Sequence, residues 1–480
     1  MLEFAIVGAG FSGIAIARAL ERSGESDWCV FEKAHEVGGT WRENHYPGAA
    51  CDVPSHLYSL SDAPNPSWSR LFPRQPEIQA HLRSIAAPLI KSGRVQFGEQ
   101  LQCAQWVESA KHWRLEFSSG RKICARSLVL ALGGLHVPAV PSIRGLESFG
   151  GVAFHSAQWR HDVNLKGKRV AVIGTGASAV QFVPEIAGLV AELSVFQRTP
   201  GWVIPRNDFA IRPWLRLAFA RWSGLRKGFR GGIFMLLELL STALTHRRSG
   251  FWGRALARWH LRRQVSDPQL RRKLTPSYPI GCKRVLVSSS YYPALQLPQV
   301  KLIDQPVDSV VVDGIKLKDG RVVPADVLIY GTGFRPLDVL SSLQIYGRDG
   351  RELANDWRER PQAHLGISPH GYPNFHLMLG PNTALGHNSV LYMVESQANH
   401  IVALHRERKR RGVLSAEATE RAQRLYLARV DAGFASSAWN GGCHSWYLNE
   451  QGINVALWTG SCLSYRRLTR TIGTQDYLFS

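Results

Sequence analysis

The stretch Phe4-Ala5-Ile6-Val7-Gly8-Ala9-Gly10-Phe11-Ser12-Gly13 decides the fold of this chain. Its short apolar run predicts a buried strand, and the glycine-rich turn leads into a helix-like segment. Glycines in such a turn let the backbone bend tightly and approach a pyrophosphate, which binds at the positive end of the helix. The pattern recurs as Val170 to Ile173 followed by Gly174-Thr175-Gly176-Ala177-Ser178-Ala179. The chain is therefore predicted to be an α/β protein with two Rossmann-like, dinucleotide-binding domains.

The two loops differ in the residue that ends the following strand. Glu32 lies 19 residues beyond Gly13, and a carboxylate there can accept both hydroxyls of an unphosphorylated ribose, such as that of FAD or NAD. Arg198 lies 19 residues beyond Ala179, where a guanidinium suits a 2′-phosphate. The second loop is therefore predicted to bind NADPH, and two dinucleotides held by one chain indicate electron transfer between them.

The composition is that of an ordinary globular chain. Its 480 residues suggest about three domains, and a hydrophobic content of 45% is sufficient for a sizeable core. Met1-Leu2-Glu3 runs directly into the first strand, so no signal peptide is expected. Seven cysteines are scattered without a CxxC pair, which argues against a disulfide framework or a zinc site and fits a reducing cytosol. We expect a cytoplasmic protein.

Apolar strands and turn residues divide the chain. Arg126 to Gly134 (RSLVLALGG) is predicted to be a strand of the first sheet, and a linker rich in proline and glycine follows it. Asp326 to Phe334 (DVLIYGTGF) is a further buried strand, which we expect to lead the chain back to the first domain. The predicted organisation is an FAD-binding domain at residues 1–145 and 326–480, an NADPH-binding domain at 146–325, and a helical insert at about 208–275.

Positive charge is concentrated in one segment. The net charge is +21, and Arg206 to Lys273 contains 16 Lys/Arg and 3 Asp/Glu together with many aromatic residues. Its apolar run Ile233 to Leu240 contains Glu238 and is far shorter than the ~20 residues of a membrane span. Basic aromatic helices often lie on anionic membranes, so peripheral contact with the inner membrane surface is one interpretation. The other is a solvated insert whose aromatics pack on the parent domain; nucleic-acid binding is less consistent, because no nucleic-acid module occurs elsewhere.

Several long motifs identify a family. Phe149 to Trp159 (FGGVAFHSAQW) and Gly38 to Asp52 (GGTWRENHYPGAACD) match the patterns FxGxxxHxxxW and GGxWxxxxYPGxxxD. Together with GCKR (281–284), YYP (291–293), GPNTALGHNS (380–389) and SWYL (445–448), they resemble the motifs of Baeyer–Villiger monooxygenases and the related flavin-containing monooxygenases. The chain departs from the family's pattern at Arg160, Ile453 and Thr459, which bears on the fine positioning of nicotinamide and substrate.

The resemblance implies a reaction. NADPH reduces FAD, the reduced flavin and O2 form a C4a-peroxide, and the peroxide inserts one oxygen atom next to a ketone carbonyl to give an ester or lactone. Such a site must exclude water and hold a fixed positive charge. The resemblance assigns this charge to Arg284, which stays protonated in any environment, with Asp52 as the carboxylate that orients it. The expected partners are O2 and a small ketone or sulfide, because S- or N-oxygenation by the same peroxide is the alternative.

The resemblance also implies the remaining site residues. His155 is interpreted as a linker residue that positions the two domains, and no metal ligands are expected. A third interpretation, a non-oxygenating flavin-binding protein at a membrane surface, is supported only by Arg160 and the basic segment. The expected FAD contacts are Gly8, Gly10, Phe11, Ser12, Gly13, Glu32, Gly39, Thr40, Trp41, Asp52 and Tyr58, and the expected NADPH contacts are Thr175, Gly176, Ala177, Ser178, Ala179, Gln181, Arg198, Thr199 and Lys283.

Overall fold

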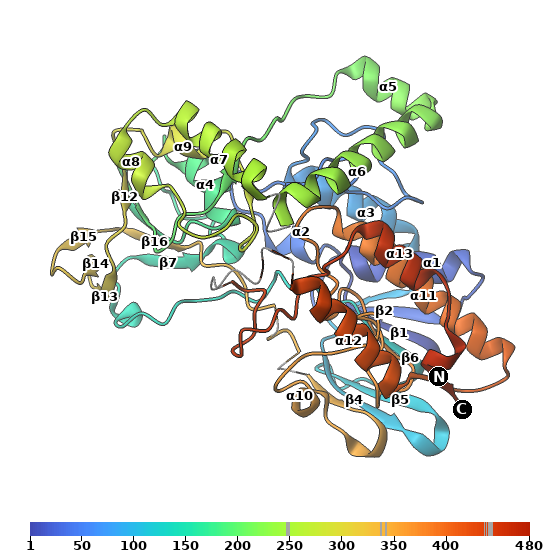
Figure 1. The fold of residues 1–480 in the computed structure, drawn as a ribbon. Helices are drawn as coiled ribbons and strands as arrows, with labels where there is room; N and C mark the ends of the chain where they lie inside the picture. Colours follow the sequence, from blue (N-terminus) through green and yellow to red (C-terminus); the bar gives the residue numbers. More distant parts are fainter. Residues whose placement is uncertain (246–249, 337, 341–342, 436, 438, 440–444) are drawn as a thin grey trace.

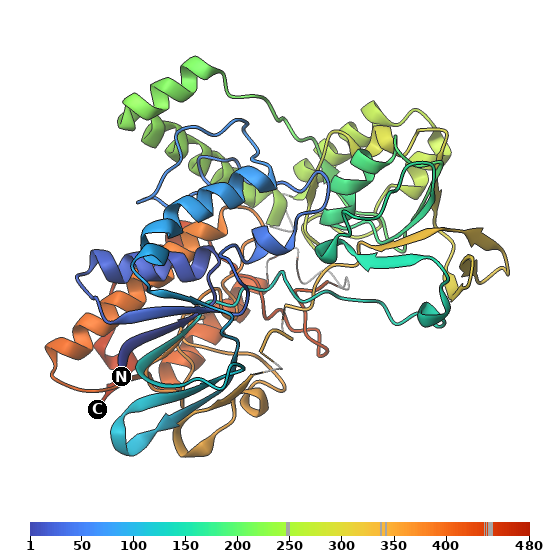
Figure 2. The ribbon, with the colours of Figure 1, turned by 180° about the vertical axis from the view of Figure 1, so that it is seen from behind.

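The computed structural model describes residues 1–245, 250–336, 338–340, 343–435, 437, 439 and 445–480. Figure 1 shows two α/β lobes, each built on its own sheet, with both termini on the same lobe. The view from behind in Figure 2 shows that the two lobes are joined by several extended segments, with helices of the basic segment above them.

The first lobe is built on a mixed sheet of eight described strands. In order across the sheet they are β17 (Gln344–Tyr346), β4 (Leu101–Val107), β5 (His112–Phe117), β6 (Lys122–Leu130), β1 (Leu2–Val7), β2 (Trp28–Glu32) and β3 (Val95–Phe97), with β18 (Phe375–Leu377) also beside β6. The apolar β1 pairs in parallel with β2 and β6. Helix α1 (Phe11–Arg22) follows β1 and packs against α11 (Val390–Arg410). The first glycine-rich loop therefore joins a central buried strand to a buried helix.

The second lobe repeats this arrangement on a parallel sheet. Its strands, in order, are β12 (Val300–Ile303), β9 (Glu192–Phe196), β8 (Arg169–Ile173), β16 (Val327–Tyr330) and β7 (Val152–His155). Helix α4 (Ala177–Ile186) follows β8 through the second glycine-rich loop and buries Val180, Phe182 and Val183. Two parallel strand–loop–helix units in separate lobes confirm the predicted fold class.

One predicted boundary is wrong. The strand expected to lead into the second part of the first domain, β16, pairs with β7 and β8 and belongs to the second sheet. Its apolar sequence shows that it is buried, but the choice of sheet depends on distant pairing partners. The chain re-enters the first sheet at β17 and β18, which pair with β4 and β6. The first lobe is thus built from two separated parts of the chain.

The basic segment forms helices that contact both lobes. Phe219 and Phe234 of its first helices join the core of the first lobe, whereas Leu261 and Val265 join the core of the second. No helix in the described ranges is long and apolar enough to cross a membrane. The helices are α5 (Pro213–Arg221), α6 (Ser223–Thr245), α7 (Gly250–Gln264) and α8 (Pro268–Lys273).

The other described helices and strands are mostly short and complete the two lobes. The helices are α2 (Thr40–Glu43), α3 (Gln75–Lys91), α9 (Tyr291–Ala294), α10 (Leu353–Asp356), α12 (Glu420–Phe434) and α13 (Cys462–Arg470). The strands are β10 (Val203–Ile204) with β11 (Leu286–Val287), β13 (Val307–Val311) with β14 (Gly314–Leu317) and β15 (Val322–Pro324), and β19 (Ala416–Ala418) with β20 (Tyr477–Phe479).

Candidate active site

A cavity of about 1810 Å³ is lined by both glycine-rich loops and by residues of both lobes. Nearly all of the predicted site residues line it: Gly8, Gly10, Phe11, Ser12, Glu32, Gly39, Thr40, Trp41, Asp52, Tyr58, Thr175, Gly176, Ala177, Ser178, Gln181, Arg198, Thr199, Lys283 and Arg284. Gly13 and Ala179 are not in the lining. A Cβ at Gly13 would lie 1.8 Å from the carbonyl oxygen of Gly8, and Ala179 is fully buried. These two positions serve close helix–strand packing instead of ligand contact.

The first loop has the geometry of a pyrophosphate cradle. Gly8 has a φ of +106°, and a Cβ there would lie 2.6 Å from the carbonyl oxygen of Ala131. Helix α1 begins after Gly10 without a side-chain cap, so its first N–H groups are open to a ligand. The backbone of Gly39 lies close to that of Gly10, so a Cβ on Gly39 would be 3.1 Å from the Cα of Gly10. The backbone therefore fits a pyrophosphate and has no room for a side chain at Gly8 or Gly39.

Glu32 stands at the edge of the same cradle. Only 4% of this residue is exposed, and its Oε2 accepts a hydrogen bond of 2.7 Å from the N–H of Ala9. Its Oε1 lies 3.2 Å from Nη1 of Arg42. These contacts fix a buried carboxylate beside the loop, at the position where the sequence predicts ribose recognition. The donor and acceptor pattern fits FAD in the first lobe.

The second loop has an equivalent cradle with cations beside it. Gly174 has a φ of +108°, and a Cβ there would lie 2.4 Å from the carbonyl oxygen of Gly331. Helix α4 also begins without a side-chain cap. Burial and then the charge of Arg198 lower the pKa of Lys283. Neither Arg198 nor Lys283 forms a salt bridge with a described carboxylate. Two adjacent cations without a counter-ion fit a phosphate, and so fit NADPH in preference to NADH.

Arg284 and Asp52 form an ion pair on the cavity wall. The Nε and Nη2 atoms of Arg284 donate to Oδ2 of Asp52 over 3.1 and 2.5 Å. The two side chains remain 34% and 26% exposed, because both face the cavity. The negative charge of Asp52 is the main cause that raises the pKa of Arg284, against the opposing effect of burial. The guanidinium is therefore a permanent positive charge held in a fixed orientation.

Tyr447 lies beside Arg284, a contact that the SWYL motif (445–448) did not predict. This fully buried tyrosine lies within reach of Arg284, and burial raises the pKa of its hydroxyl despite the nearby positive charge. Its motif, SWYL, marks a family segment, but no spacing in the sequence connects residue 447 with residue 284. A long-range contact of this kind becomes visible only in the fold.

Trp41 and Tyr58 form an apolar part of the wall. The indole Nε1 of Trp41 donates a hydrogen bond of 3.0 Å to the hydroxyl of Tyr58, and the two rings meet edge to face with centroids 5.6 Å apart. Burial raises the pKa of Tyr58 far above its usual range, so the hydroxyl stays protonated. The pair provides a rigid surface suited to exclude water from a bound ring system.

Gln181 connects the two lobes, in addition to lining the cavity. Its Oε1 accepts a hydrogen bond of 3.0 Å from the hydroxyl of Tyr46, and its Nε2 donates to the carbonyl oxygen of Ala50 over 2.9 Å. Because α4 carries Gln181 and the YPG motif carries Tyr46, these bonds fix the position of the second lobe relative to the first. This positioning role was not predicted from the sequence.

The other residues singled out in the sequence lie away from the cavity. His155 is buried at the end of β7, where its Nδ1 accepts from the N–H of Ala157 and its ring meets Phe334 edge to face. Burial lowers the pKa of His155, so it is neutral at physiological pH. Arg160 forms an exposed ion pair with Asp162. Cys282 is disulfide-bonded, whereas Cys29, Cys51, Cys103, Cys124 and Cys462 are free.

Two dinucleotide cradles that share one cavity define a two-dinucleotide flavoprotein, and comparisons with known proteins agree. The family model described as pyridine nucleotide-disulphide oxidoreductase matches residues 5–226. A Baeyer–Villiger monooxygenase of Pseudomonas aeruginosa is 44% identical over 478 residues, which cover 99% of this chain and 91% of that protein. The chain belongs to the Baeyer–Villiger monooxygenase family, which confirms the resemblance found in its motifs.

Solved structures agree over the whole length. The closed crystal structure of cyclohexanone monooxygenase superposes with a TM-score of 0.89 at 25% identity, covering 100% of this chain and 99% of that one. OTEMO in complex with FAD and NADP superposes with a TM-score of 0.88 at 26% identity, with the same coverage of both chains. The family is thus supported by the sequence, by the cavity and by the overall fold.

Proposed function

We propose that this chain is an FAD- and NADPH-dependent monooxygenase that converts a ketone to an ester or lactone, with Arg284 as its catalytic cation. One oxygen atom of O2 enters the product, the other leaves as water, and NADPH with one proton supplies the two electrons. FAD and NADPH, when bound, supply the reducing equivalents and the activation of O2. The protein's own residues bind these groups, exclude water and stabilise charge. NADP in solved relatives, and the name cyclohexanone monooxygenase, support this assignment.

The Arg284–Asp52 pair is the observation that carries the proposal. Oxygen insertion next to a carbonyl develops negative charge on oxygen, and a fixed guanidinium stabilises that charge more in the transition state than in the ground state. Asp52 accepts from Nε and Nη2, so the guanidinium cannot rotate freely. Tyr447 packs on the same group from the C-terminal part of the chain and acts as a positioning residue.

The first lobe is proposed to hold FAD and the second NADPH. Glu32 and the turn Gly8 to Gly13 support the first assignment, and Arg198 with Lys283 supports the second. Oxygenation of sulfur or nitrogen is the alternative reaction. It leaves no negative charge on the acceptor atom, so it would make less use of an oriented cation beside the cavity. The anchored Arg284 therefore favours the ketone reaction.

A product assay tests the reaction directly. Purified protein is mixed with NADPH, air and a panel of ketones and thioethers, and the products are analysed by mass spectrometry. Labelled ¹⁸O2 should place one heavy oxygen in the ester. Sulfoxides without esters would support the alternative reaction. NADPH oxidation that yields only hydrogen peroxide with every substrate would support a non-oxygenating flavoprotein.

We also propose that the basic insert, α5 to α7, contacts an anionic membrane surface. The alternative interpretation has the aromatics of the insert packed on the parent domain. Phe234 packs in this way, but Trp214, Trp222 and Trp252 are each at least 60% exposed. On α6, Leu225 and Leu236 are exposed on the side of the helix opposite the buried Phe234. A surface helix that is apolar on both sides is unusual unless its outer side has a partner.

The charge of the insert favours lipid as that partner. Exposed arginines lie between the exposed aromatics of α7, and the guanidinium of Arg263 stacks 5.4 Å from the ring centroid of Trp259. Basic residues beside tryptophan and leucine are typical of helices that lie in the interface of anionic bilayers. The exposed residues of α7 are Phe251, Trp252, Arg254, Ala255, Leu256, Arg258, Trp259, Arg262 and Arg263.

A further inference from the structure

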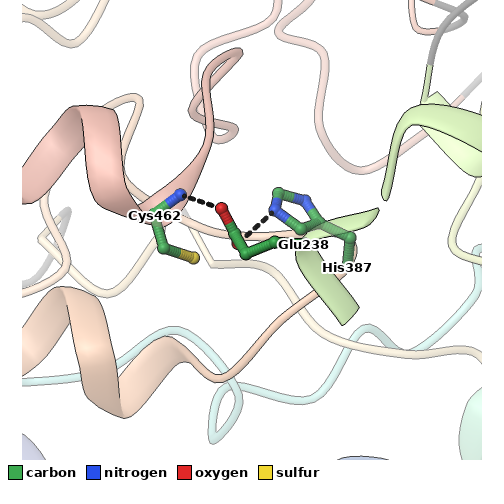
Figure 3. Close-up of side chains that lie close together, drawn as sticks. All are labelled: Glu238, His387 and Cys462. Atoms are coloured by element: carbon green, nitrogen blue, oxygen red, sulfur yellow. Dashed lines mark hydrogen bonds and ion pairs between the residues drawn. The ribbon is translucent and has the colours of Figure 1, made fainter. Parts of the chain in front are cut away.

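Three possible metal ligands from distant parts of the chain meet behind the cavity wall. They are Glu238 of α6, His387 of the loop before α11, and Cys462, the first residue of α13. One ligand atom of each lies within 4.8 Å of the others. Figure 3 shows the carboxylate of Glu238 between the imidazole of His387 and the backbone N–H of Cys462. Helix α6, the loop before α11 (called the cavity loop below) and helix α13 thus converge at one point.

The side chain of His387 is buried, and its polar neighbour is the carboxylate of Glu238. Its side chain is only 4% exposed, and neither ring nitrogen makes a hydrogen bond with the described residues. Its Nε2 lies 3.4 Å from Oε1 of Glu238, close enough for an ion pair but without hydrogen-bond geometry. Buried ring nitrogens that lack a well-formed hydrogen bond are uncommon in folded proteins. The imidazole therefore faces the carboxylate of Glu238 at ion-pair distance, at the point where the thiol of Cys462 also lies within reach.

The carboxylate of Glu238 is already oriented by neighbouring groups. Asn388 donates from Nδ2 to its Oε1 over 2.8 Å, and the backbone N–H of Cys462 donates to its Oε2 over 3.1 Å. Such outer contacts are typical of the residues that orient metal-binding carboxylates. Asn388 also lines the cavity. A ligand held by Glu238 would consequently fix part of the cavity wall.

We propose that Glu238, His387 and Cys462 bind one zinc-class divalent ion, which holds α6 to α13 and to the cavity loop. A thiolate, an imidazole and a carboxylate are the donor set that Zn²⁺ prefers, whereas Mg²⁺ and Ca²⁺ take oxygen donors. The carboxylate and the thiolate together neutralise the ion. Binding displaces the thiol proton of Cys462, which passes to solvent. Three protein donors leave the fourth tetrahedral position for water.

The sequence predicted no such site, because its donors are too far apart to form a motif. Glu238 and His387 are separated by 149 positions, and His387 and Cys462 by 75. Known zinc motifs place at least two donors within about five residues of each other. The absence of a CxxC pair therefore excludes only sites built on local spacing.

Metal binding is measured on the full-length, FAD-loaded protein. The protein is treated with a chelator, desalted and titrated with ZnCl2 against a chromophoric competitor. Bound zinc is counted by mass spectrometry, and X-ray absorption at the zinc edge identifies the donor atoms. We expect one zinc ion per chain with one sulfur among its donors. No stoichiometric zinc, or a zinc shell without sulfur, would overturn the proposal.

Two variants and a matched control connect the binding to these residues. Cys462→Ser and His387→Gln should each weaken zinc binding by at least about 100-fold, since loss of an outer partner alone costs ~10–100-fold. Cys29→Ser, which removes a half-buried thiol on β2, should bind zinc like the parent. Flavin content and circular dichroism show that each variant is folded. Equal affinity in all three variants would mean that zinc binds elsewhere, and that Glu238 joins the three segments without a metal.

Discussion

Arg284 and Asp52 are 232 positions apart in the sequence and are joined by two hydrogen bonds at the cavity wall. Asp52 belongs to the first lobe, and Arg284 follows the insert of the second. The pair therefore forms only when the two lobes are correctly placed, which the bonds of Gln181 to Tyr46 and Ala50 help to ensure. The proposed catalytic role of Arg284 would therefore depend on the arrangement of both lobes.

Gly10→Ala should give a folded protein without flavin. A Cβ at Gly10 would meet no other protein atom closer than 3.6 Å, so the polypeptide tolerates it, whereas the approaching pyrophosphate does not. Absorbance of the purified protein measures the flavin content, and thermal unfolding checks the fold. Gly188→Ala is the matched control, because its Cβ has open space. A Gly10→Ala protein that still purifies with one FAD per chain would refute the first cradle.

Arg198→Ala should raise the Michaelis constant for NADPH about 10- to 100-fold and leave that for NADH nearly unchanged. A charged hydrogen bond to a phosphate contributes ~1.5–3 kcal/mol, which sets this range. Steady-state kinetics with both coenzymes measure the effect. Arg321→Ala, which removes an exposed arginine of the same lobe, should behave like the parent. Equal effects of Arg198→Ala on both coenzymes would show that another residue recognises the 2′-phosphate.

Asp52→Asn should lower ester formation by about 10- to 100-fold, because a misoriented catalytic group loses this much rate. The loss should not depend on pH between about 6 and 9, since Arg284 stays protonated without its carboxylate partner. The charge of Asp52 raises the pKa of Arg284, so removing Asp52 lowers this pKa toward its ordinary value, which is still far above this pH range. A pH–rate profile measures it. A loss that disappears at low pH would indicate that Asp52 itself acts as a base.

Anionic vesicles should bind the protein at low salt and release it at high salt. Each arginine near such a surface contributes about 1 kcal/mol, and exposed charges are screened over ~8 Å at physiological ionic strength. Co-sedimentation measures the bound fraction. The double substitution Leu236→Ser and Trp252→Ser should weaken binding, and Leu425→Ser, at an exposed leucine of α12, should not. Failure to co-sediment at low salt would leave a solvated insert as the explanation.

Local sequence was sufficient to predict the two glycine-rich turns and most of the residues that line the cavity. Gly8 and Gly174 shape the backbone of the two turns, and Glu32 lies at a fixed short spacing from the first turn, so all three positions can be predicted from the strand–loop–helix pattern. The positioning roles of Gln181 and Tyr447 could not be predicted from local sequence, because both residues contact partners more than 130 positions away. The exposure of Trp252 was likewise not determined by its sequence, since a tryptophan on a helix is as compatible with a core as with a surface.

Arg284→Ala, examined in both halves of the reaction, tests the central claim most directly. Stopped-flow absorbance without oxygen should show that NADPH reduces the bound FAD within about an order of magnitude of the parental rate, because hydride transfer needs little help from this cation. In air, ester formation should fall by ~10²–10³ with hydrogen peroxide in its place, while the surface variant Arg160→Ala retains parental coupling. If Arg284→Ala still converts ketone to ester at parental efficiency, Arg284 is not the catalytic cation.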